Sequence, residues 1–168
     1  MSRSTRVVLG LAVLGLFAAG ASAEEKANNS LKDGQLTQTL VIKDVQGGFA
    51  GFTGEQWTVE PSGAWKHYRV FNEKLELLKE GRLTKEQLAH LAAALAKYDL
   101  MTLKNLDEGK RMANPHVVTI SYGKHEATLV LRAGAPLPKP DPKSLPGRYA
   151  GIIQEVQSLT KGKGGADK

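Results

Sequence analysis

The four histidines are the residues best able to bind a metal ion or act as a base in this cysteine-free chain. His116 and His125 stand on either side of Gly123-Lys124, which is typical of a two-residue hairpin turn. In that register His125 pairs with Tyr122, and His116 lies about 20 Å away at ~3.4 Å per residue. These two histidines cannot share an ion, and thiolate zinc sites are excluded. We therefore expect no metal site. A site built from His67 and one other histidine is the alternative.

The sequence contains no recognisable motif for catalysis by a nucleophile or by paired carboxylates. A serine nucleophile needs a histidine base and an orienting acid, and the chain has no G-x-S-x-G elbow. Glycoside hydrolysis needs two facing acids, whereas the acidic residues fit strand ends and loops. No catalytic residue is predicted. A hydrolase whose site the fold assembles from distant residues stays as an alternative.

The glycine-rich segment from Gly47 to Gly54 is predicted to be a loop at a sheet edge. A phosphate cradle needs a helix directly after the glycines, and a strand pattern follows instead, so no cofactor is predicted. Phe49 and Phe52 in this loop, with Trp65 and Tyr68 on the strand that follows the next turn, are the predicted binding residues. The alternative for Trp65 is packing in the core.

Local signals predict two hairpins and two helices. Pro61-Ser62-Gly63 is a turn between strands at 55–60 and 64–71. Thr84 and Gln87 form a capping box that starts a helix over 85–97. A second hairpin spans 116–122 and 125–132, and a helix with apolar residues from Tyr149 to Leu159 closes the domain.

These elements, with a first strand at 39–43, give the order β-ββα-ββα. We expect an α+β fold: a single antiparallel sheet of about five strands with two helices packed on one face. The domain is predicted to span residues 36–160. A charged loop at 105–114 and a proline-rich crossover at 133–147 connect its parts.

The ends of the chain are predicted to lie outside that domain. Arg3 and Arg6, an apolar run and Ala21-Ser22-Ala23 are typical of a signal peptide over 1–23, and an uncleaved membrane anchor is the alternative. A disordered leader over 24–35 and a disordered basic tail over 161–168 are predicted. The protein is therefore expected in the periplasm or outside the cell, with no transmembrane segment after cleavage.

The charge of the chain is mildly basic, with 23 Lys and Arg against 17 Asp and Glu. A nucleic-acid-binding protein concentrates its cations on one face or helix, and the sequence shows no such stripe. We therefore expect no nucleic-acid partner.

Three stretches resemble a group of small exported bacterial proteins of unknown function: GGFAGFTGEQWTVEPSGAWKHY, RLTKEQLAHLAAALAKYDL and NPHVVTISYGKHEATLVL. They cover residues 47–131. The resemblance implies the order glycine loop, hairpin, helix and hairpin, and it implies no activity. Some of those proteins carry cysteine in the glycine loop, which this chain lacks.

Together these patterns predict an exported, non-enzymatic binding protein of the cell envelope. Its expected partner is an envelope or secreted protein. The alternatives are a small exported hydrolase and a polysaccharide-binding envelope protein.

Overall fold

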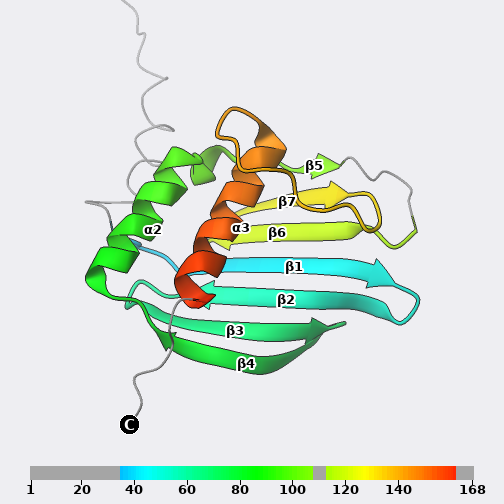
Figure 1. Ribbon diagram of the computed structural model, residues 1–168, viewed down its shortest axis with the longest axis horizontal. Helices are drawn as coiled ribbons and strands as arrows, with labels where there is room; N and C mark the ends of the chain where they lie inside the picture. The colour runs from blue at the N-terminus through cyan, green and yellow to red at the C-terminus, as the bar shows by residue number, and fades with distance from the viewer. Residues whose placement is uncertain (1–34, 108–112, 162–168) are drawn as a thin grey trace, which may run out of the picture.

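A seven-stranded mixed sheet forms the centre of the molecule, and two helices lie on one of its faces (Figure 1). The computed structural model describes residues 35–107 and 113–161. The strand order across the sheet is β4-β3-β2-β1-β6-β7-β5. The elements are β1 (Leu40–Gly48), β2 (Gly51–Val59), β3 (Ala64–Phe71), β4 (Lys74–Arg82), α2 (Lys85–Lys97), the 3₁₀ helix η2 (Leu100–Thr102), β5 (Leu106–Asp107), β6 (His116–Tyr122), β7 (His125–Leu131) and α3 (Leu145–Lys161).

The predicted sheet of about five antiparallel strands was wrong in number and in direction, although the α+β class holds. The sheet has seven strands, and β5 runs parallel to β7. Strand β5 has only two residues and lies within the predicted charged loop. A strand this short leaves no periodic pattern in a sequence, so its pairing with β7 was not predictable.

Strand β4 was missed because its sequence, KLELLKEGR, is rich in charged residues and all nine residues are exposed. It is an edge strand, paired with β3 alone. Its register shifts between His67 and Tyr68 of β3, which leaves Leu78 as an extra, bulged residue. The bulge interrupts the alternation by which strands are recognised.

The glycine-rich segment is not a loop, as predicted, but a hairpin formed by β1 and β2. Its register places Gly48 opposite Gly51, so that only Phe49 and Ala50 form the turn. Glycine is needed inside β2 as well. A Cβ atom on Gly54 would lie 2.1 Å from the carbonyl oxygen of Asp44 on β1, so this position accepts no side chain without displacement of the backbone.

The core lies between the helices and the sheet face that they cover, here called the helix-covered face. The opposite face, which no helix of the described chain covers, is called the helix-free face (Figure 1). Side chains of the helix-covered face interlock with the inward stripes of α2 and α3. The largest fully buried side chains include Trp57, Ile42, Leu91, Leu95, Ile120, Tyr122, Leu129, Tyr149, Ile152 and Ile153.

The helix start and the second hairpin are as predicted. Thr84 accepts a hydrogen bond from the Gln87 amide, and the Gln87 side chain accepts one from the Thr84 amide, so the capping box is complete. In the second hairpin Tyr122 pairs with His125 and His116 with Leu131, which is the predicted register.

The predicted signal peptide over 1–23, nearly all of the leader and residues 162–168 of the tail lie outside the described residues. Lys161, predicted to begin the tail, is the last residue of α3. Neither α2 nor α3, the α-helices of the described ranges, is long and apolar enough to cross a membrane.

Replacing Thr84 with alanine is expected to lower the free energy of unfolding by ~1 kcal/mol, because the amide of Gln87 loses its acceptor. Chemical denaturation measures the change. Thr84→Ser keeps the oxygen and serves as the control. Equal midpoints for Thr84→Ala and the parent chain would contradict this role of the cap.

Gly54→Ala is expected to destabilise the chain by about 1–3 kcal/mol, because the new methyl group overlaps the backbone of β1. Gly48→Ala is the matched control, since its Cβ would lie 3.5 Å from the nearest atom, the Gly51 carbonyl oxygen, an ordinary contact. Thermal unfolding of the two variants compares them directly. Equal losses of stability would refute the close approach at Gly54.

Candidate functional site

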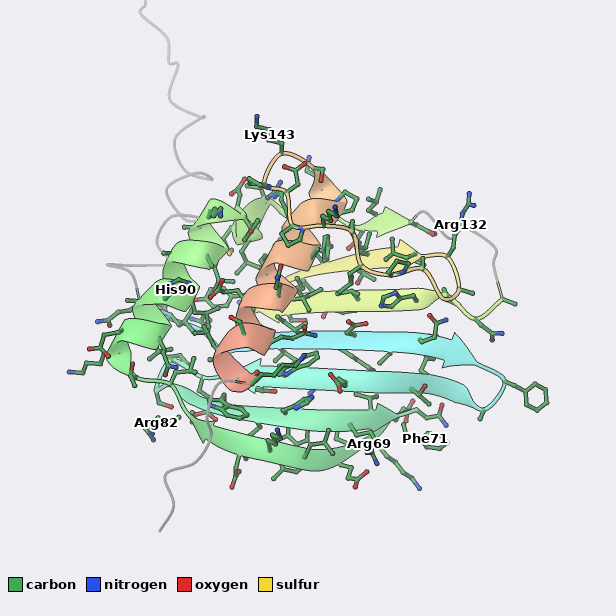
Figure 2. The ribbon with its side chains drawn as sticks, viewed as in Figure 1. Arg69, Phe71, Arg82, His90, Arg132 and Lys143 are labelled. Carbon is green, nitrogen blue, oxygen red and sulfur yellow. The ribbon has the colours of Figure 1, made fainter. Side chains whose placement is uncertain are left out.

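The three phenylalanines of the described chain are all exposed, and they gather at one end of the sheet. Phe49 is fully exposed, Phe52 is 39% exposed and Phe71 is 48% exposed. Phenylalanine is among the residues most often buried, so three exposed rings at one place need an explanation. Phe71 lies near the end of the sheet beyond both helices (Figure 2). We call Phe49, Phe52 and Phe71 the aromatic corner.

The rings of the aromatic corner point in different directions. Phe49 lies in the turn between β1 and β2. Phe52 pairs with Gly47 and belongs to the helix-free face, because side chains alternate along β2 from Trp57. Phe71 pairs with Thr53 and belongs to the helix-covered face, beyond the reach of the helices. The corner is therefore a projecting apolar knob rather than a flat strip or a cleft.

Hydrogen bonds to neighbouring segments hold the hairpin tip in place. Asn72, in the left-handed region with φ of 55°, accepts a bond from the Phe52 amide at 2.9 Å and donates to the Ala50 carbonyl at 3.2 Å. On the other side the Gly47 amide donates to the Pro115 carbonyl at 2.7 Å. The tip is thus fixed from both sides, so Phe49 is presented on an ordered support.

Of the other two predicted binding residues, Trp65 is a core residue and Tyr68 is half-buried. The Trp65 indole is 5% exposed and covers Gly81, where a Cβ atom would lie 2.8 Å from the ring. Tyr68 belongs to the helix-free face, between Gln56 and Leu77. Neither joins the aromatic corner. Phe71 was not among the four predicted binding residues; it alternates in phase with Trp65, a pattern that predicts burial.

An Asp–His pair lies on the helix-covered face, close to the aromatic corner. His116 Nε2 is 2.6 Å from Asp44 Oδ1, and its Nδ1 is 2.8 Å from the Ala135 carbonyl oxygen. Both side chains are largely buried. The hydrogen bond to Asp44 raises the pKa of His116 above its ordinary value, although desolvation opposes the shift. We call this arrangement the His116 clamp.

The His116 clamp is suited to hold the proline-rich crossover rather than to move protons. Each ring nitrogen faces an acceptor, so a protonated imidazole donates from both and neither is free to take a proton from a substrate. The crossover is fixed again where the Gly134 amide donates to Gln46 Oε1. The pair was not predictable, because Asp44 and His116 stand 72 residues apart.

Two further histidines, His67 and His90, make separate contacts. His67 stacks on Trp57 with ring centroids 4.8 Å apart, and its Nε2 lies 3.4 Å from Glu55 Oε2, at ion-pair distance but without hydrogen-bond geometry. His90 pairs with Glu155 on α3 at 2.9 Å. Within residues 35–107 and 113–161, no group of three or more His, Asp or Glu side chains is arranged to hold a metal ion.

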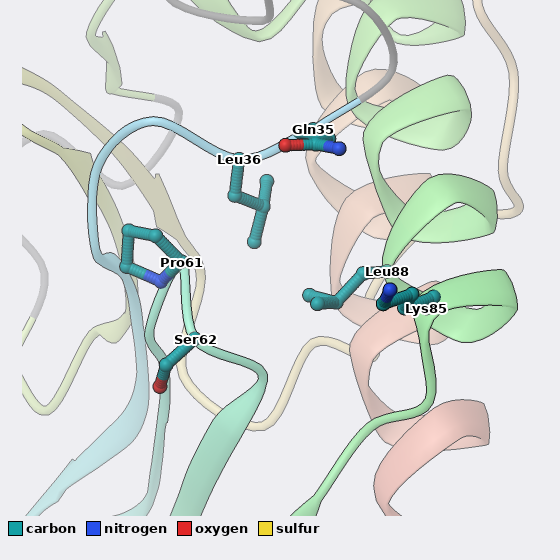
Figure 3. A pocket seen from close by; sticks show the side chains of 6 residues that line it. All are labelled: Gln35, Leu36, Pro61, Ser62, Lys85 and Leu88. Atoms are coloured by element: carbon teal, nitrogen blue, oxygen red, sulfur yellow. The ribbon is translucent and has the colours of Figure 1, made fainter.

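The pocket shown in Figure 3 lies between the start of α2 and the turn that joins β2 to β3. It has a volume of about 270 Å³. Lys85 is its one charged side chain, and the Ser62 hydroxyl donates to Glu60. Its lining brings together no acid and base. The lining residues are Gln35, Leu36, Pro61, Ser62, Lys85 and Leu88.

Neither a protein-family model nor a curated protein matches this chain. The aromatic corner, the His116 clamp and the edge of the sheet are therefore the features that bear on function.

The His116 clamp predicts that stability falls as the pH rises. Asp44 favours the protonated imidazole in the folded chain. The contribution of the Asp44–His116 pair to the free energy of unfolding is therefore complete below the ordinary histidine pKa of ~6.5, and it is lost as the pH rises through the raised pKa of His116. Chemical denaturation between about pH 5.5 and 9 measures this slope.

Asp44→Asn is expected to flatten that slope, because the amide cannot favour the charged ring. Glu126→Gln is the control, because Glu126 is an exposed carboxylate near the turn of the β6–β7 hairpin, at the end opposite to His116. A slope that Asp44→Asn leaves unchanged would contradict the assignment.

Proposed function

We propose that this protein is a non-enzymatic binding module that inserts Phe49, at the tip of the aromatic corner, into an apolar pocket of another exported protein. The observation that carries the proposal is a fully exposed Phe49 on a hairpin tip that hydrogen bonds fix from both sides. Aromatic side chains that enter pockets supply most of the binding energy at many protein interfaces. A tip that is already ordered loses little conformational entropy on binding.

The chemistry of the corner favours a protein over the other partners. The segment from Gly47 to Thr53 carries no charge, so an apolar cavity complements it. Sugar recognition uses flat aromatic surfaces on which a ring can stack, and the three phenylalanines point in different directions. A membrane-surface site combines apolar residues with lysine and arginine, which this segment lacks.

The hydrolase alternative receives less support. Its strongest group would be the His116–Asp44 pair, but both imidazole nitrogens already face protein acceptors. A general base needs a nitrogen within reach of the substrate proton. We therefore propose no catalytic residue and no cofactor.

The N-terminal sequence supports the proposed compartment. The basic residues, apolar run and Ala21-Ser22-Ala23 support export. We accordingly propose that the partner is an envelope or secreted protein, met in the periplasm or outside the cell.

A photo-crosslinking amino acid placed at position 49 in the source cell is expected to capture one protein partner. With that partner purified, Phe49→Ala is expected to weaken binding at least ~10-fold, because the pocket loses its anchor. Calorimetry or surface plasmon resonance measures the affinity.

Lys97→Ala is the matched control, since it shortens a long exposed side chain on α2. Crosslinks to lipid or polysaccharide alone, or an affinity that Phe49→Ala leaves unchanged, would refute the proposal.

A further inference from the structure

Strand β4 is the long free edge of the sheet. It stands at one end of the strand order, and it forms the lower edge in Figure 1. Backbone groups that point away from β3 therefore face no neighbouring strand within the described chain. Three leucines along it are exposed: Leu75, Leu77 and Leu78. The opposite edge, β5, offers only two residues. Such an edge is a template for pairing with another strand.

We propose that β4 pairs in antiparallel direction with β4 of a second copy of this chain, about a two-fold axis between Leu77 and Leu78. The occupant is identified by charge. In this register Glu76 of each copy lies opposite Lys79 of the other, so the symmetry creates the attraction twice.

The bulge makes this register consistent with the two faces of the sheet. Glu76 pairs with Arg69 of β3 and Lys79 with His67, so both belong to the helix-covered face although they stand three residues apart. Directly opposed residues in an antiparallel pair share a face. Leu75 and Glu80 also oppose each other across the two copies, and both belong to the helix-free face.

Other registers lose this match. Sliding the second copy by one residue places Lys79 opposite Leu75, although the two belong to opposite faces. Sliding it by two residues in one direction opposes Lys74 with Lys79, and in the other direction opposes Glu76 with Gly81. The first of these brings like charges together, and the second removes both attractions.

The same features disfavour a foreign strand. Bulges and lysines on an edge strand usually prevent pairing, because the partner must accept the kink and neutralise the charge. A second copy carries the complementary pattern by symmetry. Antiparallel pairing would also place the two aromatic corners at opposite ends of the dimer. The inference concerns a different surface from the proposed function and does not rest on it.

Sedimentation velocity of the chain purified in the form that the cell exports, over a range of concentrations, is expected to show a monomer–dimer equilibrium. Glu76→Lys alone and Lys79→Glu alone are each expected to weaken dimerisation at least ~10-fold, because each opposes like charges twice. An equimolar mixture of the two variants is expected to recover a heterodimer, since every opposed pair is then of opposite charge.

Lys124→Glu, a reversal in the exposed turn between β6 and β7, is the control and should leave the dimer unchanged. Glu76→Lys also removes an ion pair with Arg69 at 3.3 Å, but Lys79→Glu does not, so agreement between the two excludes that cause. Circular dichroism verifies that each variant is folded. A parent chain that stays monomeric, reversals without effect, or a mixture that does not associate would each overturn the proposal.

Discussion

The two helices cover only part of the length of the strands, and the rest of the structure depends on this mismatch. Packed helices lie 8–10 Å apart, so two of them side by side cover roughly 20 Å. The nine residues of β1 extend for about 30 Å at ~3.4 Å each. Figure 1 shows both helices crossing the strands toward one end. The other end of the sheet has no helix over it, and its side chains are in contact with other segments or with solvent.

The sequence of β1 changes character where the cover ends. Leu40 and Ile42 are fully buried, and the next residues on the same face are Asp44 and Gln46. These two polar side chains bind the crossover, through His116 and through the Gly134 amide. The crossover thus takes the place of a helix over this part of the sheet. Past it on this face lies Phe71, the one member of the aromatic corner on the helix-covered face, which is 48% exposed.

Local signals predicted what depends on neighbouring residues, and they failed where distant segments decide. The capping box at Thr84 and the turn at Gly123-Lys124 are complete within four residues, so the sequence alone specifies them. Burial at Trp65 and exposure at Phe71 follow from where the helices lie, although the two alternate in phase. Strand β4 was hidden because an edge strand tolerates charge on both faces.

The exposed phenylalanines are difficult to explain by stability. Burying one such side chain contributes about 1.5–3 kcal/mol, which Phe49 forgoes. Gly51 in the hairpin tip has a positive φ, and Asn72, which also has a positive φ, holds the tip from the turn between β3 and β4. A turn that served only to join β1 and β2 would need neither an aromatic side chain nor external support. Because the tip is already ordered, it loses less conformational entropy when a partner binds. This order is an advantage only if the partner has a pocket that Phe49 can enter.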